Sequence, residues 1–315
     1  MVRTYSESGV DVKKIRKMQE GINASLAQTS NKYTPNFLAG HYAGIFEIDG
    51  KKMTIHCDGV GSKILVAQAM GKHDSIGIDA VAMNANDLIC VGSKPIVGVD
   101  YLAISKEDGK LVREIMKGLV VGCKEAGIAL VGGETAILPD MIKSDKKYGN
   151  ADYDLAMTVV GVCEGETITG EKIKENDVLI GLESSGLHSN GFTLARKILN
   201  IKKFGKEMLV PTKIYVNAVM EMIGNADVHG IAHITGGAFS KLIRIGKYSG
   251  CGFVLNNMPP AKGIFEEIEK KVKDARECYR TFNMGVGMVV VVNENEAGRV
   301  IEISKKNGIN AQIIG

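Results

Sequence analysis

The spacing of apolar and polar residues divides the chain into two blocks, and in each block expected strands alternate with expected helices. In the first block, strand-like runs on both sides of Asp49 and Gly50 predict a β-hairpin over residues 41–59. Helical periodicity and extended apolar runs then follow in turn. The expected helices are 11–28, 75–92 and 110–127, and the further expected strands are 94–105, 128–133 and 153–164.

The second block begins after a charged, loop-rich segment at residues 164–177. It has the same alternating pattern, with glycine-rich loops between strands and helices. The expected strands are 178–182, 230–234, 283–294 and 310–315, and the expected helices are 192–199 and 238–246, with one more helix before the last strand. The pattern predicts an α/β (α+β) protein of two domains, residues 1–165 and 166–315.

Composition narrows the class of protein. The chain has 315 residues, of which 45% are hydrophobic and 24% are charged, as in ordinary globular proteins. Its 39 basic and 36 acidic residues leave a net charge of +3, and the short basic clusters lack interleaved aromatic residues, so we expect no nucleic-acid partner. Because no apolar run is long enough to cross a bilayer and the start lacks a secretory signal, we expect no membrane partner and a cytoplasmic location.

The first candidate site is the sequence HCDGVGSK, which follows a strand-like run. The strand delivers Asp58 to its end, and Gly59 and Gly61 let main-chain amide groups approach an anion closely. Asp58 would then hold a cation while Ser62 and Lys63 face phosphate oxygens. The alternative is a turn with a helix-capping aspartate and a solvated lysine.

The second candidate lies on the expected helix 75–92, where Asn84, Asn86 and Asp87 interrupt an apolar sequence. A carboxylate in such a surface is costly unless it is paired or binds a metal. The alternative is that Asp87 points to solvent or bonds to a lysine.

The third candidate follows the expected strand 128–133, where Gly132 and Gly133 precede Glu134 and Thr135. We expect Glu134 at a strand end, which is where α/β proteins bind ligands. Together with the two aspartates above, it would supply three oxygen ligands of the kind that Mg²⁺ prefers.

Two polar loops in the second block each precede a helix, and helix N-termini with free amide groups suit anions. The first loop contains His188, which taken alone is more often a hydrogen-bonded loop residue than a catalyst. The residues of interest are Ser184, Ser185, Gly186, His188, Ser189, Asn190 and Gly191 in the first loop and Thr235, Gly236 and Gly237 in the second.

Standard nucleotide-binding motifs are absent, since neither G-x-x-x-x-G-K-[ST] nor G-x-G-x-x-G occurs. Other sequences, however, closely resemble the motifs of the phosphoribosylformylglycinamidine cyclo-ligase family, also called aminoimidazole ribonucleotide synthetases. The resemblance covers nearly the whole chain. The motifs are DGVGSK, GIDAVAMNANDL, LVGGETA, SSGLHSNGFTLARKIL, PTKIY, HITGGAF and YRTFNMGVGM.

The resemblance implies an N-terminal domain whose strands form a barrel across a homodimer, and a C-terminal α+β domain that closes on the active site. It also implies an ATP-dependent ligase of purine biosynthesis. The implied reaction closes the ring of formylglycinamidine ribonucleotide to give 5-aminoimidazole ribonucleotide, ADP and phosphate. In that reaction ATP converts an amide oxygen to an imino-phosphate, and the amidine nitrogen then displaces phosphate.

By similarity, Asp58, Asp87 and Glu134 would bind Mg²⁺ at the triphosphate, and Lys63 would neutralise the transferring phosphoryl group. The implied catalytic residues are Lys63, Asp58, Asp87 and His188. The implied ATP contacts are Gly59, Gly61, Ser62, Lys63, Asn86, Gly132, Gly133 and Thr135. The implied substrate contacts are Ser185, His188, Ser189, Asn190, Gly191, Thr235, Gly236 and Gly237.

The chain departs from the family pattern at several places. Ser62 stands where many members have threonine, and Ala238 replaces a third glycine. Residues 31–44 fit the nucleotide-covering loop of the family poorly, and Lys32 is only a candidate for its lysine.

Two rival interpretations remain open. One is another ATP-dependent enzyme of the same superfamily, such as a small-molecule kinase or selenophosphate synthetase. The other is a non-catalytic nucleotide-binding regulator. Only the cyclo-ligase would form the cyclised product, so an assay for this product distinguishes it from both rivals.

Overall fold

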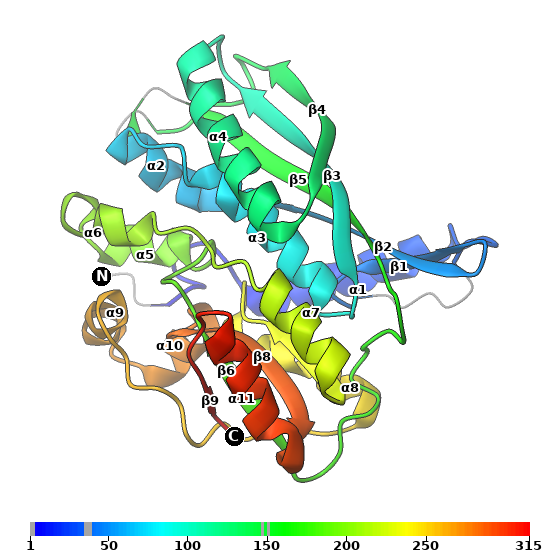
Figure 1. Ribbon diagram of the computed structural model, residues 1–315. Coiled ribbons are helices and arrows are strands. Elements are labelled where there is room, and N and C mark those ends of the chain that lie inside the picture. The colour runs from blue at the N-terminus through cyan, green and yellow to red at the C-terminus, as the bar shows by residue number, and fades with distance from the viewer. Residues whose placement is uncertain (1–3, 35–39, 146–147, 150–151) are drawn as a thin grey trace.

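The computed structural model describes residues 4–34, 40–145, 148–149 and 152–315. These residues form two β-sheets, one in each half of the chain, and helix α3 (Ile76–Ile89) contacts both of them (Figure 1). Among the described residues, no helix combines the length and the apolar character needed to span a bilayer.

The N-terminal sheet has five strands in the order β1-β2-β5-β3-β4. All neighbouring pairs are antiparallel except β3 and β4, which are parallel and joined by α4 (Gly109–Ala126). The strands are β1 (Gly44–Ile48), β2 (Lys51–Gly59), β3 (Lys94–Ile104), β4 (Ala129–Ile137) and β5 (Tyr153–Val162).

Helices α3 and α4 pack against one another, and α3 lies against β2, β3 and β5 (Figure 1). The two helices approach closely, because a Cβ atom on Gly77 would lie only 2.2 Å from the main-chain nitrogen of Leu119. This face of the sheet is therefore closely covered, and α3 is fixed against it.

The opposite face of the N-terminal sheet is open. Ile55 on β2 and Val99 and Tyr101 on β3 alternate with less exposed residues, and each of the three is 41–45% exposed. Large apolar side chains gathered on one sheet face are typical of a surface that another chain covers.

The C-terminal sheet has four antiparallel strands in the order β7-β8-β6-β9. Nearly all residues of β7 and β8 are buried, so both faces of this sheet are covered. The strands are β6 (Asp177–Glu183), β7 (Val228–His233), β8 (Val286–Asn293) and β9 (Ala311–Ile313). The helices of this half are α5 (Phe192–Ile198), α6 (Ile201–Met208), α7 (Val216–Asn225), α8 (Ile243–Ser249), α9 (Ile264–Val272), α10 (Ala275–Thr281) and α11 (Ala297–Lys306).

The structure confirms most of the expected elements, including the hairpin of β1 and β2, helices α3, α4, α5 and α11, and helix α1 (Val12–Ala27). It corrects others. The strand expected at 128–133 continues to Ile137, and the helix expected at 238–246 begins with a 3₁₀ segment, η3 (Ala238–Leu242). Helices α2 (Ile64–Met70), α6, α7, α9 and α10 were not expected, because each is ten residues or shorter and so spans only about two or three helical turns.

Candidate active site

The C-terminal part of α3 carries polar side chains at the boundary between the two halves. Asp87 is only 5% exposed, and its carboxylate accepts a hydrogen bond from Nδ1 of His233 at 2.7 Å. The Nε2 atom of His56, on β2, lies 3.4 Å from its second oxygen. Asp87 therefore pairs with two histidines, one from each half of the chain, and not with solvent or a lysine.

Asp58 lies next to this pair, near the end of β2, as predicted. Burial, together with the nearby charge of Asp87, raises the pKa of Asp58. Burial also acts to raise the pKa of Asp87, but the hydrogen bond from His233 and the neighbouring His56 leave that pKa below its usual range. A bound cation would reduce the repulsion between these two carboxylates.

The donor set fits Mg²⁺, which binds through one or two carboxylates and takes its remaining oxygen ligands from water and phosphate. Asp58 and Asp87 supply two such carboxylates. Within the described part of the chain, no group of three or more histidine, cysteine or acidic side chains is arranged to hold a metal. A cation here would need ligands from outside this chain.

The predicted third carboxylate lies elsewhere. In the N-terminal sheet, Asp58 of β2 lies opposite Met157 of β5, and Met157 lies opposite Asp100 of β3. Glu134 of β4 lies opposite Tyr101, the residue of β3 that follows Asp100. Because successive residues of a strand point to opposite faces, Asp58 lies on the helix-covered face and Glu134 on the open face.

Glu134 is also not at a strand end. It lies in the middle of the exposed edge strand β4, together with Gly132, Gly133 and Thr135. A single chain therefore does not bring Glu134 to Asp58 and Asp87, and this differs from the sequence-based expectation. The exposed glycines resemble a strand terminus in the sequence because an edge strand needs few apolar residues.

The two asparagines of α3 bind the main chain. Asn84 donates hydrogen bonds to the carbonyl oxygens of Asp58 and Ala80, at 3.1 and 2.9 Å. Asn86 donates to the carbonyl of Lys213 at 2.9 Å and accepts from the amide of Tyr215 at 3.0 Å. Asn86 was predicted to contact ATP, but in this structure its amide attaches the C-terminal half to α3.

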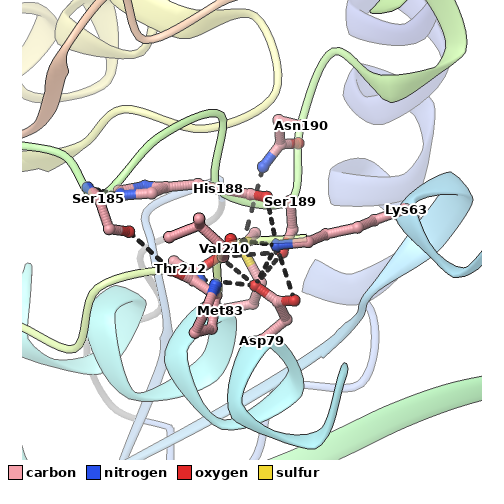
Figure 2. A network of polar contacts seen from close by, with 10 residues as sticks. Lys63, Asp79, Met83, Ser185, His188, Ser189, Asn190, Val210 and Thr212 are labelled. Atoms are coloured by element: carbon pink, nitrogen blue, oxygen red, sulfur yellow. Dashed lines mark hydrogen bonds and ion pairs between the residues drawn. The ribbon is translucent and has the colours of Figure 1, made fainter. Parts of the chain in front are cut away.

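Lys63 occupies a buried polar network rather than a phosphate site (Figure 2). Its ammonium group lies 2.9 Å from both carboxylate oxygens of Asp79, and the side chains of both residues are 0% exposed. It also donates to the carbonyl oxygens of His188 and Val210, at 2.9 and 2.7 Å. Because an ammonium has three donors, none is left for a phosphoryl group, contrary to the predicted role of Lys63.

The glycine-rich turn before Lys63 lies at the boundary between the halves. The amide of Gly59 donates to the Asp58 carboxylate at 2.8 Å, and Gly61 begins the 3₁₀ segment η1 (Gly61–Lys63). The hydroxyl of Ser62 lies 3.2 Å from that of Thr193 on α5. The turn therefore contacts the C-terminal half directly.

In the first predicted substrate loop, several side chains point into the protein. The Ser185 hydroxyl donates to the carbonyl of Pro211 at 2.6 Å, and the Ser189 hydroxyl donates to Asp79 at 3.1 Å (Figure 2). His188 is buried with a φ of +60°, and its Nε2 atom accepts from the Ser185 amide at 3.3 Å. Burial, with added repulsion from His233 and Lys63, holds the pKa of His188 well below its usual value, so its ring is neutral.

The two predicted substrate loops meet. A Cβ atom on Gly236 would lie 3.0 Å from the side-chain oxygen of Asn190, so a side chain there would crowd the other loop. Thr235, Gly237 and Gly191 flank this contact, and the Asn190 amide also lies 3.8 Å from the sulfur of Met83 on α3. The structure thus brings both loops to the same side of α3.

Of the predicted nucleotide-covering segment, residues 35–39 lie outside the described residues. Lys32 is exposed, with its ammonium 4.9 Å from the ring centre of Tyr33. His41 is buried and donates from Nε2 to the carbonyl of Thr169 at 3.2 Å.

Sequence reasoning missed three residues of this region, namely Asp79, His233 and His56. The sequence did contain a signal for Asp79, because this residue, like Asp87, is a carboxylate within the apolar sequence of α3. Nothing in the sequence indicated that the two histidines would share Asp87, since they lie on different strands.

Known proteins are similar to this chain in sequence and in fold. Residues 40–163 match the family described as "AIR synthase related protein, N-terminal domain", and residues 174–315 match "AIR synthase related protein, C-terminal domain". The chain is 45% identical over 319 residues to the phosphoribosylformylglycinamidine cyclo-ligase of Pyrococcus horikoshii, a match that covers 96% of this chain and 92% of that protein. It is 42% identical over 333 residues to the protein of the same name from Methanobrevibacter smithii, covering 99% and 94%.

Among solved structures, AaThiL complexed with AMPPCP and TMP has a TM-score of 0.66 and 14% sequence identity, covering 97% of this chain and 92% of that chain. At this identity the similarity shows a common fold only.

Proposed function

The chain belongs to the phosphoribosylformylglycinamidine cyclo-ligase family, and we propose that it catalyses the ATP-dependent ring closure of formylglycinamidine ribonucleotide. The products would be 5-aminoimidazole ribonucleotide, ADP and phosphate. Identity of 45% over nearly the whole length of a named cyclo-ligase supports this activity rather than that of a kinase of similar fold.

The structural observation that carries the proposal is the pair of Asp58, which is half-buried, and Asp87, which is buried; both lie beside two histidines where the two halves meet. These carboxylates would hold Mg²⁺, which when bound would neutralise charge on the ATP phosphates. His233 and His56 would keep Asp87 ionised and oriented, as second partners of metal ligands commonly do.

The reaction would proceed in two steps. The formyl amide oxygen attacks the γ-phosphorus of ATP, ADP leaves and the amide N–H proton is lost, so that the oxygen becomes part of an imino-phosphate. The amidine nitrogen then attacks the formyl carbon and loses its proton, the bond from this carbon to the phosphorylated oxygen breaks, and phosphate departs with the electron pair. Positioning and electrostatic stabilisation are the main contributions that a protein makes to such phosphoryl transfer.

The two adjoining loops are the proposed substrate site. Asn190, Thr235 and Gly236 lie where the loops meet, beside α3. Gly59 and Gly61, in the turn that precedes α2, remain proposed ATP contacts, as do Gly132, Gly133 and Thr135 on β4. Glu134 remains a proposed Mg²⁺ ligand only if a second chain supplies it.

We also propose that the protein is a homodimer joined through the open face of the N-terminal sheet, with residues 1–165 as the ATP-binding and dimerisation domain. The exposed side chains of Ile55, Val99 and Tyr101 support this, since covering them would remove apolar area from water. Tyr101→Asp should halve the mass measured by sedimentation, whereas unchanged mass would exclude this face.

The activity is tested by incubating the protein with formylglycinamidine ribonucleotide, ATP and Mg²⁺ and measuring the aminoimidazole product by a colorimetric amine assay. We expect product with the wild type and at least about a 100-fold lower rate with Asp58→Asn, because a group that stabilises transition-state charge is lost. Asp140→Asn is the matched control, since the side chain of Asp140 is 95% exposed. Tight ATP binding without product would reject the cyclo-ligase activity.

A further inference from the structure

Asp79 lies at the centre of the buried network in Figure 2, and no role had been assigned to it. Its Oδ1 atom accepts from the Thr212 amide and the Thr212 hydroxyl, both at 2.7 Å, and from the Ser189 hydroxyl at 3.1 Å. The two hydroxyl groups also lie 3.0 Å from each other. One carboxylate on α3 therefore binds two separate segments of the C-terminal half.

Lys63 extends the same network. It neutralises Asp79, and its two other donors bind the carbonyl oxygens of His188 and Val210. Both segments that Asp79 contacts are thus bound a second time by its ion-pair partner, one at residues 188–189 and the other at residues 210–212. The pair joins four parts of the chain, which come from both halves of the molecule.

A completely buried ion pair adds little net stability, because removing both charges from water costs about as much as their attraction returns. Breaking the pair, in contrast, leaves one buried charge without a partner. The pair is therefore better suited to fixing one geometry than to increasing stability. The geometry that it fixes is that of the loop beginning at Ser185.

We propose that Asp79 is a positioning residue, whose buried pair with Lys63 holds the loop 185–191 in its substrate-binding shape against α3. The inference rests on the proposed function in one respect, the assignment of this loop to substrate. It assigns Lys63 to the same positioning role, acting through main-chain carbonyls and not on the phosphoryl group.

The loop has a conformation that needs such support. His188 has a left-handed backbone, with a φ of +60°, which costs free energy for a residue other than glycine. The main-chain carbonyl of this same residue accepts the hydrogen bond from Lys63, and the next residue, Ser189, donates to Asp79. Without the pair, the loop would relax and Asn190 would move away from Gly236.

The test compares Asp79→Asn, Lys63→Met and the double variant with the wild type. Hydrogen–deuterium exchange is measured at amides 185–191, and KM is measured separately for formylglycinamidine ribonucleotide and for ATP. We expect each single variant to exchange at least about tenfold faster in this loop and to raise the substrate KM about tenfold, with the KM for ATP changed less than about threefold. The double variant leaves no unpaired charge, so it should regain stability relative to the single variants, but its loop should still exchange faster than in the wild type because the hydrogen bonds that the pair makes to the loop are lost.

Ser189→Ala keeps the inference testable if a single charge variant does not fold. It removes one hydroxyl and leaves the ion pair, so we expect normal folding and about a fivefold higher substrate KM. Lys143→Met/Asp140→Asn removes an exposed pair of the same type and should change nothing.

Unchanged exchange at residues 185–191 in Asp79→Asn would overturn the inference, whether or not the protein is active. So would a double variant that regains wild-type exchange at these residues, because something other than the pair would then hold the loop. If the wild type makes no product, the proposed function fails, and the exchange measurement alone decides the role of Asp79.

Discussion

The two ends of helix α3 carry the same side chain in opposite settings. Asp79 lies in its first turn and Asp87 in its last, about 12 Å apart along the helix axis. Asp79 is paired with a lysine whose donors are all occupied, and no part of either side chain reaches solvent. Asp87 is paired with two histidines and lies beside a second carboxylate.

The difference shows that burial alone does not identify a functional carboxylate. A buried charge whose counter-charge has no donor left over holds structure, whereas neighbouring carboxylates that perturb one another retain the capacity to bind a cation. Sequence similarity had placed Lys63 and Asp87 in one catalytic group. The contacts separate them, and each of the following changes tests that separation.

Lys63→Met should have the largest effect on stability. It leaves the Asp79 carboxylate buried without its counter-charge, and we expect a loss of about 3–5 kcal/mol in the free energy of unfolding. Urea denaturation followed by circular dichroism measures this loss. A change below about 1 kcal/mol would show that the network is not a structural unit.

His41 gives a third setting, because among the described residues this buried side chain forms no ion pair with a carboxylate. Burial lowers the pKa of His41 to about 4, and the nearby Lys247 and Arg244 contribute to the shift. Between that value and the unfolded pKa near 6.5, only the unfolded chain takes up the proton, so stability should fall by about 3 kcal/mol as the pH drops from 7 to 4.

His41→Gln should remove most of this pH dependence. The measurement is urea unfolding at a series of pH values, with wild type and variant compared at each. If the unfolding free energies of the two proteins changed equally between pH 6.5 and 4, His41 would not be the origin of the pH dependence.

Asp87→Asn should act mainly on activity. The asparagine oxygen can still accept from His233, so the fold should persist, but the charge that would hold Mg²⁺ is lost. We expect turnover about 100-fold below wild type and only partly restored by high Mg²⁺. Turnover within twofold of wild type would show that Asp87 is not part of the active site and that it does not differ from Asp79 in function.

Ala238→Gly should have the smallest effect. Ala238, next to the second substrate loop, has a φ of +44°, and glycine adopts this conformation without steric cost. We expect a gain of about 1 kcal/mol in unfolding free energy. Ala24→Gly, on an exposed part of α1, is the matched control and should lose a similar amount. A loss at Ala238 would indicate that its methyl group makes necessary contacts.

Local patterns predicted much of the fold. The hairpin of β1 and β2 and the helix α3 follow from periodicity and turn residues that lie together in the sequence. The partners of Asp79 do not, because Ser189 and Thr212 lie 110 and 133 residues away. Glu134 was misplaced for a related reason, since the exposed edge strand β4 lacks the apolar pattern by which a strand is recognised.

The open face of the N-terminal sheet has a consequence for how the protein behaves during its synthesis. Its apolar strands emerge from the ribosome before the C-terminal half exists, and no segment of the described chain covers Val99 or Tyr101 later. If a second copy provides the cover, folding is completed by a bimolecular step. The thermal midpoint should then rise with protein concentration, and refolding to the native dimer should become slower on dilution.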